Sequence, residues 1–464
     1  MKLVGYLQLL FVLCLCAILG TPQTAFSSIE HFMLNEHFYE DRCKVLFALN
    51  DESDGSVYCY ESREAYNYVY NMAAIAFALA LIPAFYSSKY MGFSVTNLLC
   101  FISLGAGSMV ITSSSEEQWL DDRMGYGYAL VAFSGPFAII NALNIISQLG
   151  KSRGLLIFLL FLLFATLQLS PLVWTVISWQ FSNIDLTVSD LFKGLLWLPA
   201  VSIILTLALM PLTSTSQDFD LLEFIRTVKS HFFFFQPNAN DRIDAVNSNY
   251  MAGNEQSSLI QTVFSQPFIS LLLAYTANST SMDLMYLGGE ARASFHKELA
   301  VWVEITLWSP VIAAVFSPLI ISLNLKRGIN CGLTVGFLLS TVLTLAQFWS
   351  IRISWLFASL VSGLAQSAIV LATTLYLMKI IETEECGILA ALFLLASSLC
   401  KLWFLPIVES ATEFDTLVLG WNPYSVILCA QLLFSSYSLL VAKIQAFKER
   451  RWLLELEAII ACDP

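Results

Sequence analysis

The chain has 464 residues, of which 57% are hydrophobic and only 12% are charged. A soluble domain carries about 25% charged residues, so this composition excludes a water-soluble globular fold. The formal net charge of -12 excludes a nucleic-acid-binding protein, because the phosphate backbone requires a basic surface. The hydrophobic runs lack the alternation of a membrane β-barrel, which leaves membrane-spanning helices.

Twelve apolar runs are long enough to cross a bilayer, which takes about 20 helical residues. They form two sets of six on either side of the polar residues 212–256. The predicted spans, in chain order, are residues 4–22, 67–88, 93–112, 126–147, 154–179, 187–211, 257–277, 300–322, 329–350, 353–378, 387–408 and 421–443. We therefore predict an all-α membrane protein with 12 transmembrane helices in two six-helix bundles.

The first run has two interpretations. Lys2, the apolar residues 3–19 and the small residues Gly20 and Thr21 also fit a cleaved signal peptide. Cleavage would leave eleven spans and destroy the division into two sets of six. The even count favours retention of the run as span one.

The predicted domains follow from the spans. Residues 1–211 form the N-terminal bundle, with a long outer loop at 23–66, and residues 257–444 form the C-terminal bundle. Residues 212–256 are a cytoplasmic linker, in which an amphipathic stretch lies on the membrane surface or against the underside of the protein. Residues 445–464 are a cytoplasmic tail.

The distribution of charge predicts the orientation. Lys and Arg collect in the loops on the side of both termini, and the opposite loops are acidic, so we expect both termini in the cytoplasm. On the outer side, Cys43 and Cys59 could form a disulfide in an oxidising compartment. The sequon at Asn278, between spans seven and eight, predicts glycosylation. These features favour an integral protein of the plasma membrane or an endomembrane.

Spans two and eight end alike, with Pro83 before Lys89 in one and Pro318 before Lys326 in the other. Such parallel six-helix repeats are typical of the major facilitator superfamily. The element Asn67-Tyr68-Val69-Tyr70-Asn71, with the outer-loop cysteines and Tyr286-Leu287-Gly288, resembles solute carrier family 43 and the related apicomplexan amino acid transporters. This resemblance implies a carrier of large neutral amino acids.

The loop after span two departs from the superfamily pattern Gly-x-x-x-Asp-Arg-x-Gly. Residues 85–92 read Phe-Tyr-Ser-Ser-Lys-Tyr-Met-Gly, so only the final glycine, Gly92, is kept. The missing Asp and Arg normally lock the cytoplasmic gate in this superfamily. The gate of this chain must therefore close differently, or the protein has lost active transport.

Two charged residues stand out within the predicted spans, because charges inside a membrane are rare and usually face a cavity or a partner. Glu304 lies in span eight and Lys401 at a comparable depth in span eleven. One interpretation is that Lys401 attracts a substrate carboxylate and Glu304 an ammonium group or a coupling proton. The other is that each pairs with a neighbouring helix or reaches the outer interface.

Helix-breaking and polar residues in spans one, four, seven and ten form a second set of candidates. Gly135 and Pro136 interrupt span four, Asn141 lies below them, and Gln366 lies in span ten. In this fold these four spans line the central cavity, and backbone amides freed at a break can bind a carboxylate. We predict that Gly135, Pro136, Asn141 and Gln366 contact substrate, the alternative being simple kinking and close packing.

These features predict a transporter that moves a small organic solute, most simply a neutral or cationic amino acid, by alternating access. Facilitated diffusion or exchange is expected, with Glu304 leaving proton coupling open. No nucleotide loop, metal-ligand spacing or catalytic cluster occurs, so neither a cofactor nor an enzymatic activity is expected. A non-transporting receptor of this fold and a carrier of a sugar, nucleoside or organic anion are the alternatives.

Overall fold

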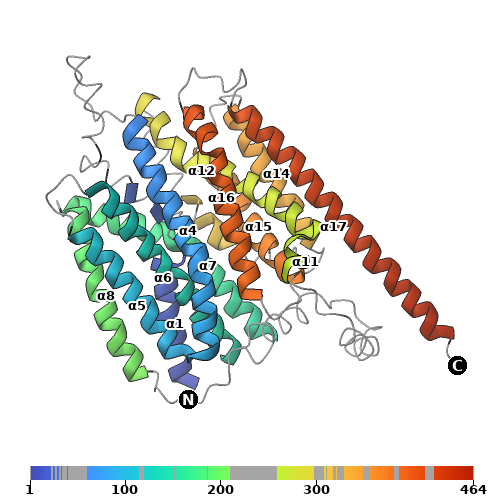
Figure 1. Ribbon diagram of the computed structural model, residues 1–464, viewed down its shortest axis with the longest axis horizontal. Helices are drawn as coiled ribbons and strands as arrows, with labels where there is room; N and C mark the ends of the chain where they lie inside the picture. The colour runs from blue at the N-terminus through green and yellow to red at the C-terminus, as the bar shows by residue number, and fades with distance from the viewer. Residues whose placement is uncertain are drawn as a thin grey trace.

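A computed structural model gives the arrangement of the chain (Figure 1). It describes residues 2–21, 25–26, 29–30, 33, 39, 60–113, 120–149, 153–184, 186–209, 259–296, 308–309, 311–316, 320, 329–348, 355–380, 386–412 and 423–462. All regular secondary structure in these residues is helical, as the composition predicts.

The N-terminal half contains one long helix for each of the first six predicted spans. These helices are α1 (Lys2–Leu19), α4 (Tyr60–Tyr90), α5 (Gly92–Thr112), α6 (Leu120–Leu149), α7 (Arg153–Asn183) and α8 (Val188–Leu209). A capping box begins α8: Thr187 Oγ1 accepts from Asp190 N at 3.2 Å, and Asp190 Oδ2 accepts from Thr187 N at 3.3 Å.

The C-terminal half contains helices for spans seven and nine to twelve. They are the short α11 (Leu259–Val263), α12 (Gln266–His296), α14 (Ile329–Phe348), α15 (Trp355–Ile380), α16 (Cys386–Thr412) and α17 (Pro423–Cys462). Within span eight, the described residues 308–309, 311–316 and 320 are helical, and the remainder lies outside the described residues, as does the linker 212–256. The count of twelve membrane helices therefore stays a prediction.

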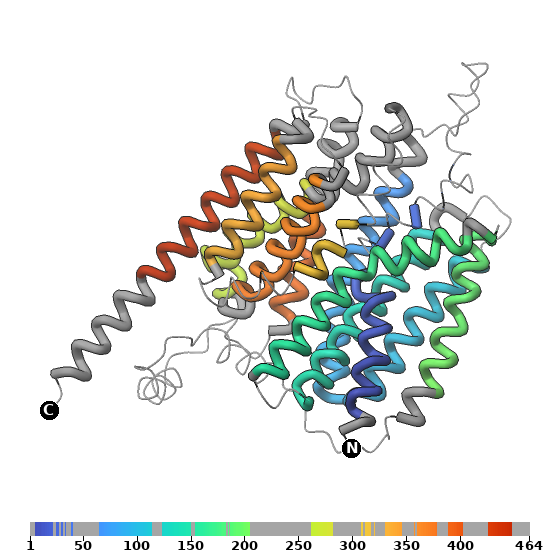
Figure 2. The backbone as a smooth tube through the Cα atoms, turned by 180° about the vertical axis from the view of Figure 1, so that it is seen from behind, coloured from blue at the N-terminus to red at the C-terminus, as the bar shows by residue number. Residues whose placement is uncertain are grey.

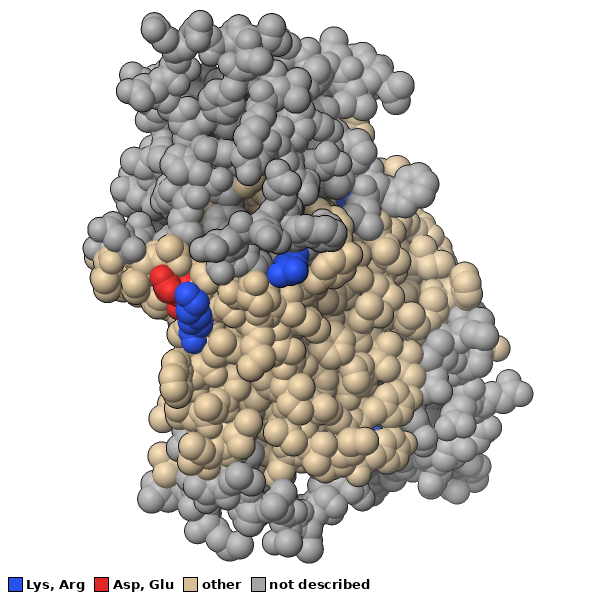
Figure 3. Space-filling model, turned by 60° about the vertical axis from the view of Figure 1, so that its left-hand side comes forward, with Lys and Arg blue, Asp and Glu red and all other residues tan. Residues whose placement is uncertain are grey.

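The described helices have the character of membrane spans. Among the described residues, five segments are long and apolar enough to cross a bilayer: Ala65–Thr112, which covers most of α4 and all of α5, and Arg123–Leu149, Gly154–Phe181, Leu360–Leu377 and Val426–Phe447. Large apolar side chains such as Trp197, Ile204 and Leu433 point outward. Figure 3 shows a face that is uncharged over almost all of its described area. The protein is therefore an integral membrane protein.

Packing divides the helices into two groups. In the N-terminal half α6 packs against α1, α4 and α5, while in the C-terminal half α12 packs against α16 and α17. The halves meet where α4 lies along α16, as Figure 1 shows. Span eleven, which is α16, therefore borders the N-terminal half.

The predicted tail is largely a continuation of the last helix. α17 runs to Cys462 and projects beyond the other helices (Figure 1). Figure 2 shows the coloured part of α17 from behind, where it packs beside α14. Residues 443–462 contain neither Gly nor Pro and are rich in helix-forming Leu, Glu, Lys, Arg and Ala. Helix propensity thus carries α17 past the point where the membrane-spanning hydrophobicity ends.

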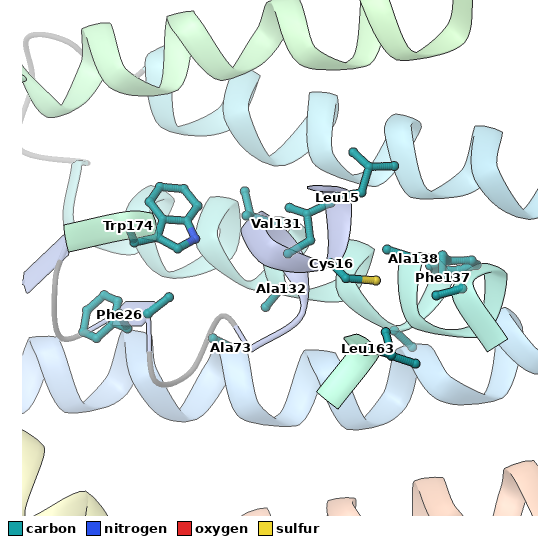
Figure 4. Packing of buried hydrophobic residues seen from close by; sticks show 14 of the residues in the cluster. Leu15, Cys16, Phe26, Ala73, Val131, Ala132, Phe137, Ala138, Leu163 and Trp174 are labelled. Carbon is teal, nitrogen blue, oxygen red and sulfur yellow. The ribbon is translucent and has the colours of Figure 1, made fainter. Parts of the chain in front are cut away.

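The first residues of the predicted outer loop 23–66 are buried. α1 ends at Leu19, before the predicted end at residue 22, and Gly20 N donates to Cys16 O at 2.8 Å. Ala25, Phe26, and Met33 follow on, all 0% exposed. Figure 4 shows Phe26 in the same buried cluster as Ala73 and Trp174. The first apolar residues of the predicted outer loop therefore pack into the N-terminal half instead of lying exposed.

The end of α1 is hydrogen bonded to α7. Trp174 Nε1 donates to Ile18 O at 2.7 Å, and Thr21 Oγ1 donates to Leu167 O at 3.1 Å. The last carbonyls of a helix have no partner within it, so the indole supplies a donor that α1 itself cannot.

Replacement of Trp174 by phenylalanine removes this donor and leaves the carbonyl of Ile18 short of a partner. We expect a loss of about 1–3 kcal/mol of stability, seen as a lower Tm of the purified protein in detergent. Trp179→Phe on the same helix is the control, because Trp179 is 60% exposed and its loss should leave the Tm unchanged. Equal Tm values for both variants would refute the capping role.

Candidate functional site

Gly135 lies where α6 crosses the end of α1. A Cβ at this position would overlap the backbone oxygen of Leu19 and come within 2.9 Å of Phe77 Cε2. Pro136 is buried beside it, and α6 is one continuous helix through both residues. The predicted break in span four is therefore wrong, and Gly135 serves the close approach of two helices.

Asn141 lies one to two turns further along α6 and is 0% exposed. Its Nδ2 donates to Oδ1 of Asn97 on α5 at 3.3 Å. Oδ1 of Asn141 has no hydrogen-bond partner among the described residues. The side chain is thus held by α5, a contact within the N-terminal half that the sequence does not reveal.

Gln366 lies in the other half, on α15. It is partly exposed and lies one turn beyond Ser362 and Gly363. Ser362 Oγ donates to Ser309 Oγ at 2.8 Å, and a Cβ on Gly363 would come within 2.5 Å of Ser309 O. This face of α15 therefore packs against the described part of span eight. Gln366 thus belongs to the C-terminal half, whereas Gly135, Pro136 and Asn141 belong to the N-terminal half.

Lys401 is partly exposed on α16, the helix that meets α4 of the facing half. Glu304 lies outside the described residues, as do Cys43 and Cys59. The proposed pairing of these cysteines and the role of Glu304 thus remain predictions from the sequence.

The sequon asparagine does not lie in a loop. α11 ends at Val263, and α12 then continues from Gln266 to His296, well past the predicted end of span seven. Asn278 lies inside α12 and is 0% exposed. Its Nδ2 donates to Ala274 O at 2.7 Å and to Ser435 Oγ at 2.9 Å. The predicted outer-loop position is wrong, since this nitrogen is bonded within the protein and inaccessible to a glycan.

Glu30 is a candidate that the sequence analysis missed. It lies in the buried segment after α1 and is 2% exposed. Phe26, one turn earlier, contacts the rings of Tyr70 on α4 and Tyr128 on α6, with ring centroids 6.4 and 5.2 Å apart. The apolar spacing of residues 25, 29 and 33 is the signal that could have identified this helical segment.

Glu30 and Lys401 lie on opposite sides of the contact between the halves. The segment that carries Glu30 packs on α4, where Phe26 meets Tyr70, and α4 packs on α16, which carries Lys401. Tyr70 is ten residues from the start of α4, and Lys401 is eleven from the end of α16, about 15–16 Å at the helical rise. Figure 1 shows these two helix ends on the same side of the molecule. Tyr70, against which the segment that carries Glu30 packs, and Lys401 thus lie at similar depths in the two halves.

The end of α4 that leads into α5 lacks the Asp and Arg of the superfamily pattern and contains an aromatic group instead. Tyr86 and Tyr90 stack with centroids 5.9 Å apart, and Lys89 Nζ lies 5.5 Å from the centre of the Tyr90 ring. Gly92 then begins α5 with a φ of +81°, a conformation that favours glycine. The one retained residue of the pattern is therefore kept for its backbone geometry.

Comparison with known proteins establishes the type of fold. No family model matches the chain, and no curated protein matches it in sequence. Among solved structures, the chain is similar to a POT family transporter crystallised in complex with a thioalcohol-conjugated peptide. The two are 12% identical, the TM-score is 0.59, and the match covers 96% of each chain. The chain thus has a fold of the major facilitator type along nearly its whole length.

Proposed function

We propose that the protein is a carrier that moves a small zwitterionic solute across a membrane by alternating access. The observation that carries the proposal is the match to a transporter over 96% of both chains. The meeting of the two halves at α4 and α16 supports it, because alternating access moves one repeat against the other around a site between them.

The solute that we favour is a neutral amino acid. Glu30 of the N-terminal half would hold the ammonium group, and Lys401 of the C-terminal half would attract the carboxylate. Opposite charges on opposite halves suit a zwitterion, whose binding would then draw the halves together. Glu304 is a second candidate for the ammonium group or for a coupling proton, and Gln366 for a polar contact with the solute.

A short peptide is the second candidate solute. The similar solved transporter is in complex with a conjugated peptide. A dipeptide carries the same two terminal charges as an amino acid at a greater separation. The same pair of residues could therefore serve either solute, and the distance between them during transport would select one.

Uptake into liposomes that contain the purified protein tests the proposal. The uptake of labelled leucine, lysine, dialanine and glucose is measured in these liposomes and in liposomes without the protein. We expect saturable uptake of leucine or dialanine and none of glucose. Uptake of glucose alone would refute the zwitterion proposal, while no uptake of any solute by folded protein would favour the receptor alternative.

A further inference from the structure

A second group of polar side chains lies inside the C-terminal half, between α12, α14 and α17. These three helices contact one another in pairs. Six residues form the group, which we call the C-half polar cluster: Asn278, Ser281, Ser340, Thr344, Gln431 and Ser435. None is more than 6% exposed. Such a concentration of polar groups within a membrane bundle requires partners for each of them.

Two amide side chains connect α17 to its neighbours. Asn278 Nδ2 donates to Ser435 Oγ at 2.9 Å, and Gln431 Nε2 donates to Ser340 Oγ at 2.8 Å. Gln431 and Ser435 are four residues apart and lie on one face of α17. The two amides are therefore separated by about one helical turn.

A third contact closes the cluster into a ring. The hydroxyls of Ser281 and Thr344 are hydrogen bonded to each other, with either as donor. Ser281 lies three residues after Asn278 on α12, and Thr344 lies four after Ser340 on α14. Each helix thus contributes two groups from adjacent turns, and every pair of helices is joined by one hydrogen bond.

Two oxygens of this ring are left over. Asn278 Oδ1 and Gln431 Oε1 are fully buried and have no hydrogen-bond partner in the described part of the protein. The amide of Asn278 cannot simply be turned over, because its nitrogen also donates to Ala274 O at 2.7 Å. Its oxygen is therefore fixed as an acceptor, and a buried acceptor without a partner is unfavourable.

The chemistry of the ring selects the ligand. Two amide oxygens require a hydrogen-bond donor or a cation, and the hydroxyls of Ser340 and Ser435 each keep a lone pair after accepting from an amide. All six side chains are uncharged, whereas Ca²⁺ and Mg²⁺ sites in proteins rely on carboxylates. Neutral carbonyl and hydroxyl oxygens instead suit an alkali ion, whose hydration shell they replace.

We propose that the C-half polar cluster binds one alkali cation, with Asn278 Oδ1 and Gln431 Oε1 as ligands. The ion stabilises the packing of α12, α14 and α17 against one another within the C-terminal half. The proposal does not depend on which solute the protein transports or on transport itself, because binding is measured as stability.

The test is the Tm of the full-length protein in detergent, in NaCl, KCl or choline chloride of equal ionic strength. Choline is too large for the ring and serves as the reference cation. We expect a saturable rise of about 3–5 °C in NaCl or KCl over choline chloride. The salt that gives the rise at the lower concentration identifies the preferred ion.

Gln431→Leu removes one ligand and should abolish the salt-dependent rise. Gln445→Leu is the matched control on the same helix, because Gln445 accepts from Tyr376 OH at 3.0 Å outside the ring. That variant should keep the full rise. If Gln431→Leu does not fold, Asn278→Ser removes the other amide oxygen and should have the same effect.

Two results would overturn the proposal. Equal Tm values of the unsubstituted protein in all three salts would mean that buried water, rather than a cation, satisfies the two oxygens. A rise that persists in both Gln431→Leu and Asn278→Ser would place the cation elsewhere.

Discussion

Replacement of Gly135 by alanine is expected to destabilise the protein. The added Cβ would overlap the backbone oxygen of Leu19 and come within 2.9 Å of Phe77 Cε2. The backbone of α1 cannot yield as a flexible side chain would, since Trp174 and Leu167 of α7 hold its end. Overpacking of this kind costs about 1–3 kcal/mol or more, which should appear as a lower Tm of the purified protein.

Gly154→Ala provides the matched control. Gly154 lies in the first turn of α7, and a Cβ there meets nothing within 4 Å. The same substitution at an uncrowded helical position should raise stability by about 0.4–1 kcal/mol through the unfolded state. A Tm for Gly135→Ala at or above that of the unsubstituted protein would contradict the close crossing of α1 and α6.

Lys401→Met and Glu30→Gln are each expected to reduce uptake of the transported solute. Each variant removes one charge that the account assigns to the zwitterion. A charge-assisted hydrogen bond is worth about 1.5–3 kcal/mol, so the initial rate at low solute concentration should fall by about 10–100-fold. The measurement is uptake of labelled leucine or dialanine by liposomes with matched amounts of folded protein.

Lys193→Met is the control for the loss of a lysine. Lys193 forms an exposed ion pair with Asp190 at 2.9 Å on α8. Exposed pairs contribute little, so uptake should be unchanged. Full uptake by Lys401→Met would show that Lys401 does not bind the solute, whatever the result for Glu30→Gln.

Most of the helices could be predicted because lipid imposes a strong rule on the sequence. A run of about 20 apolar residues must be helical to satisfy its backbone in the membrane. That rule locates a helix but not its ends. α12 continues through Asn278, whose side chain is hydrogen bonded to Ser435 of α17. α17 continues through Lys448 because the residues there have a high helix propensity.

The same rule explains why the buried segment after α1 was not expected to pack into the N-terminal half. The segment around Phe26 and Glu30 is too short and too polar for a span, so hydropathy assigns it to a loop. Its burial depends on contacts with Tyr70 and Tyr128, which lie 44 and 102 residues away from Phe26 in the chain. A buried acid in such a segment could not be recognised before those contacts were known.

The sequence indicates which residue types could form the candidate site, but it does not indicate which residues contact one another in the fold. The contact of Asn141 with substrate stays a prediction, and its hydrogen-bond partner Asn97 lies 44 residues earlier in the chain. Gly135 was noted as a breaking residue, yet its function in packing depends on a backbone oxygen of α1. Tertiary contacts of this kind leave no periodic signal in one sequence.

Counterflow in liposomes tests the central claim most directly. Liposomes that contain the unsubstituted protein are loaded with unlabelled leucine or dialanine and diluted into a trace of the labelled solute. A carrier that exposes one site alternately to the two sides should accumulate label transiently above equilibrium, whereas a channel or a receptor cannot. Transient accumulation is the result that we predict, and its absence with every zwitterion from folded protein would contradict the account.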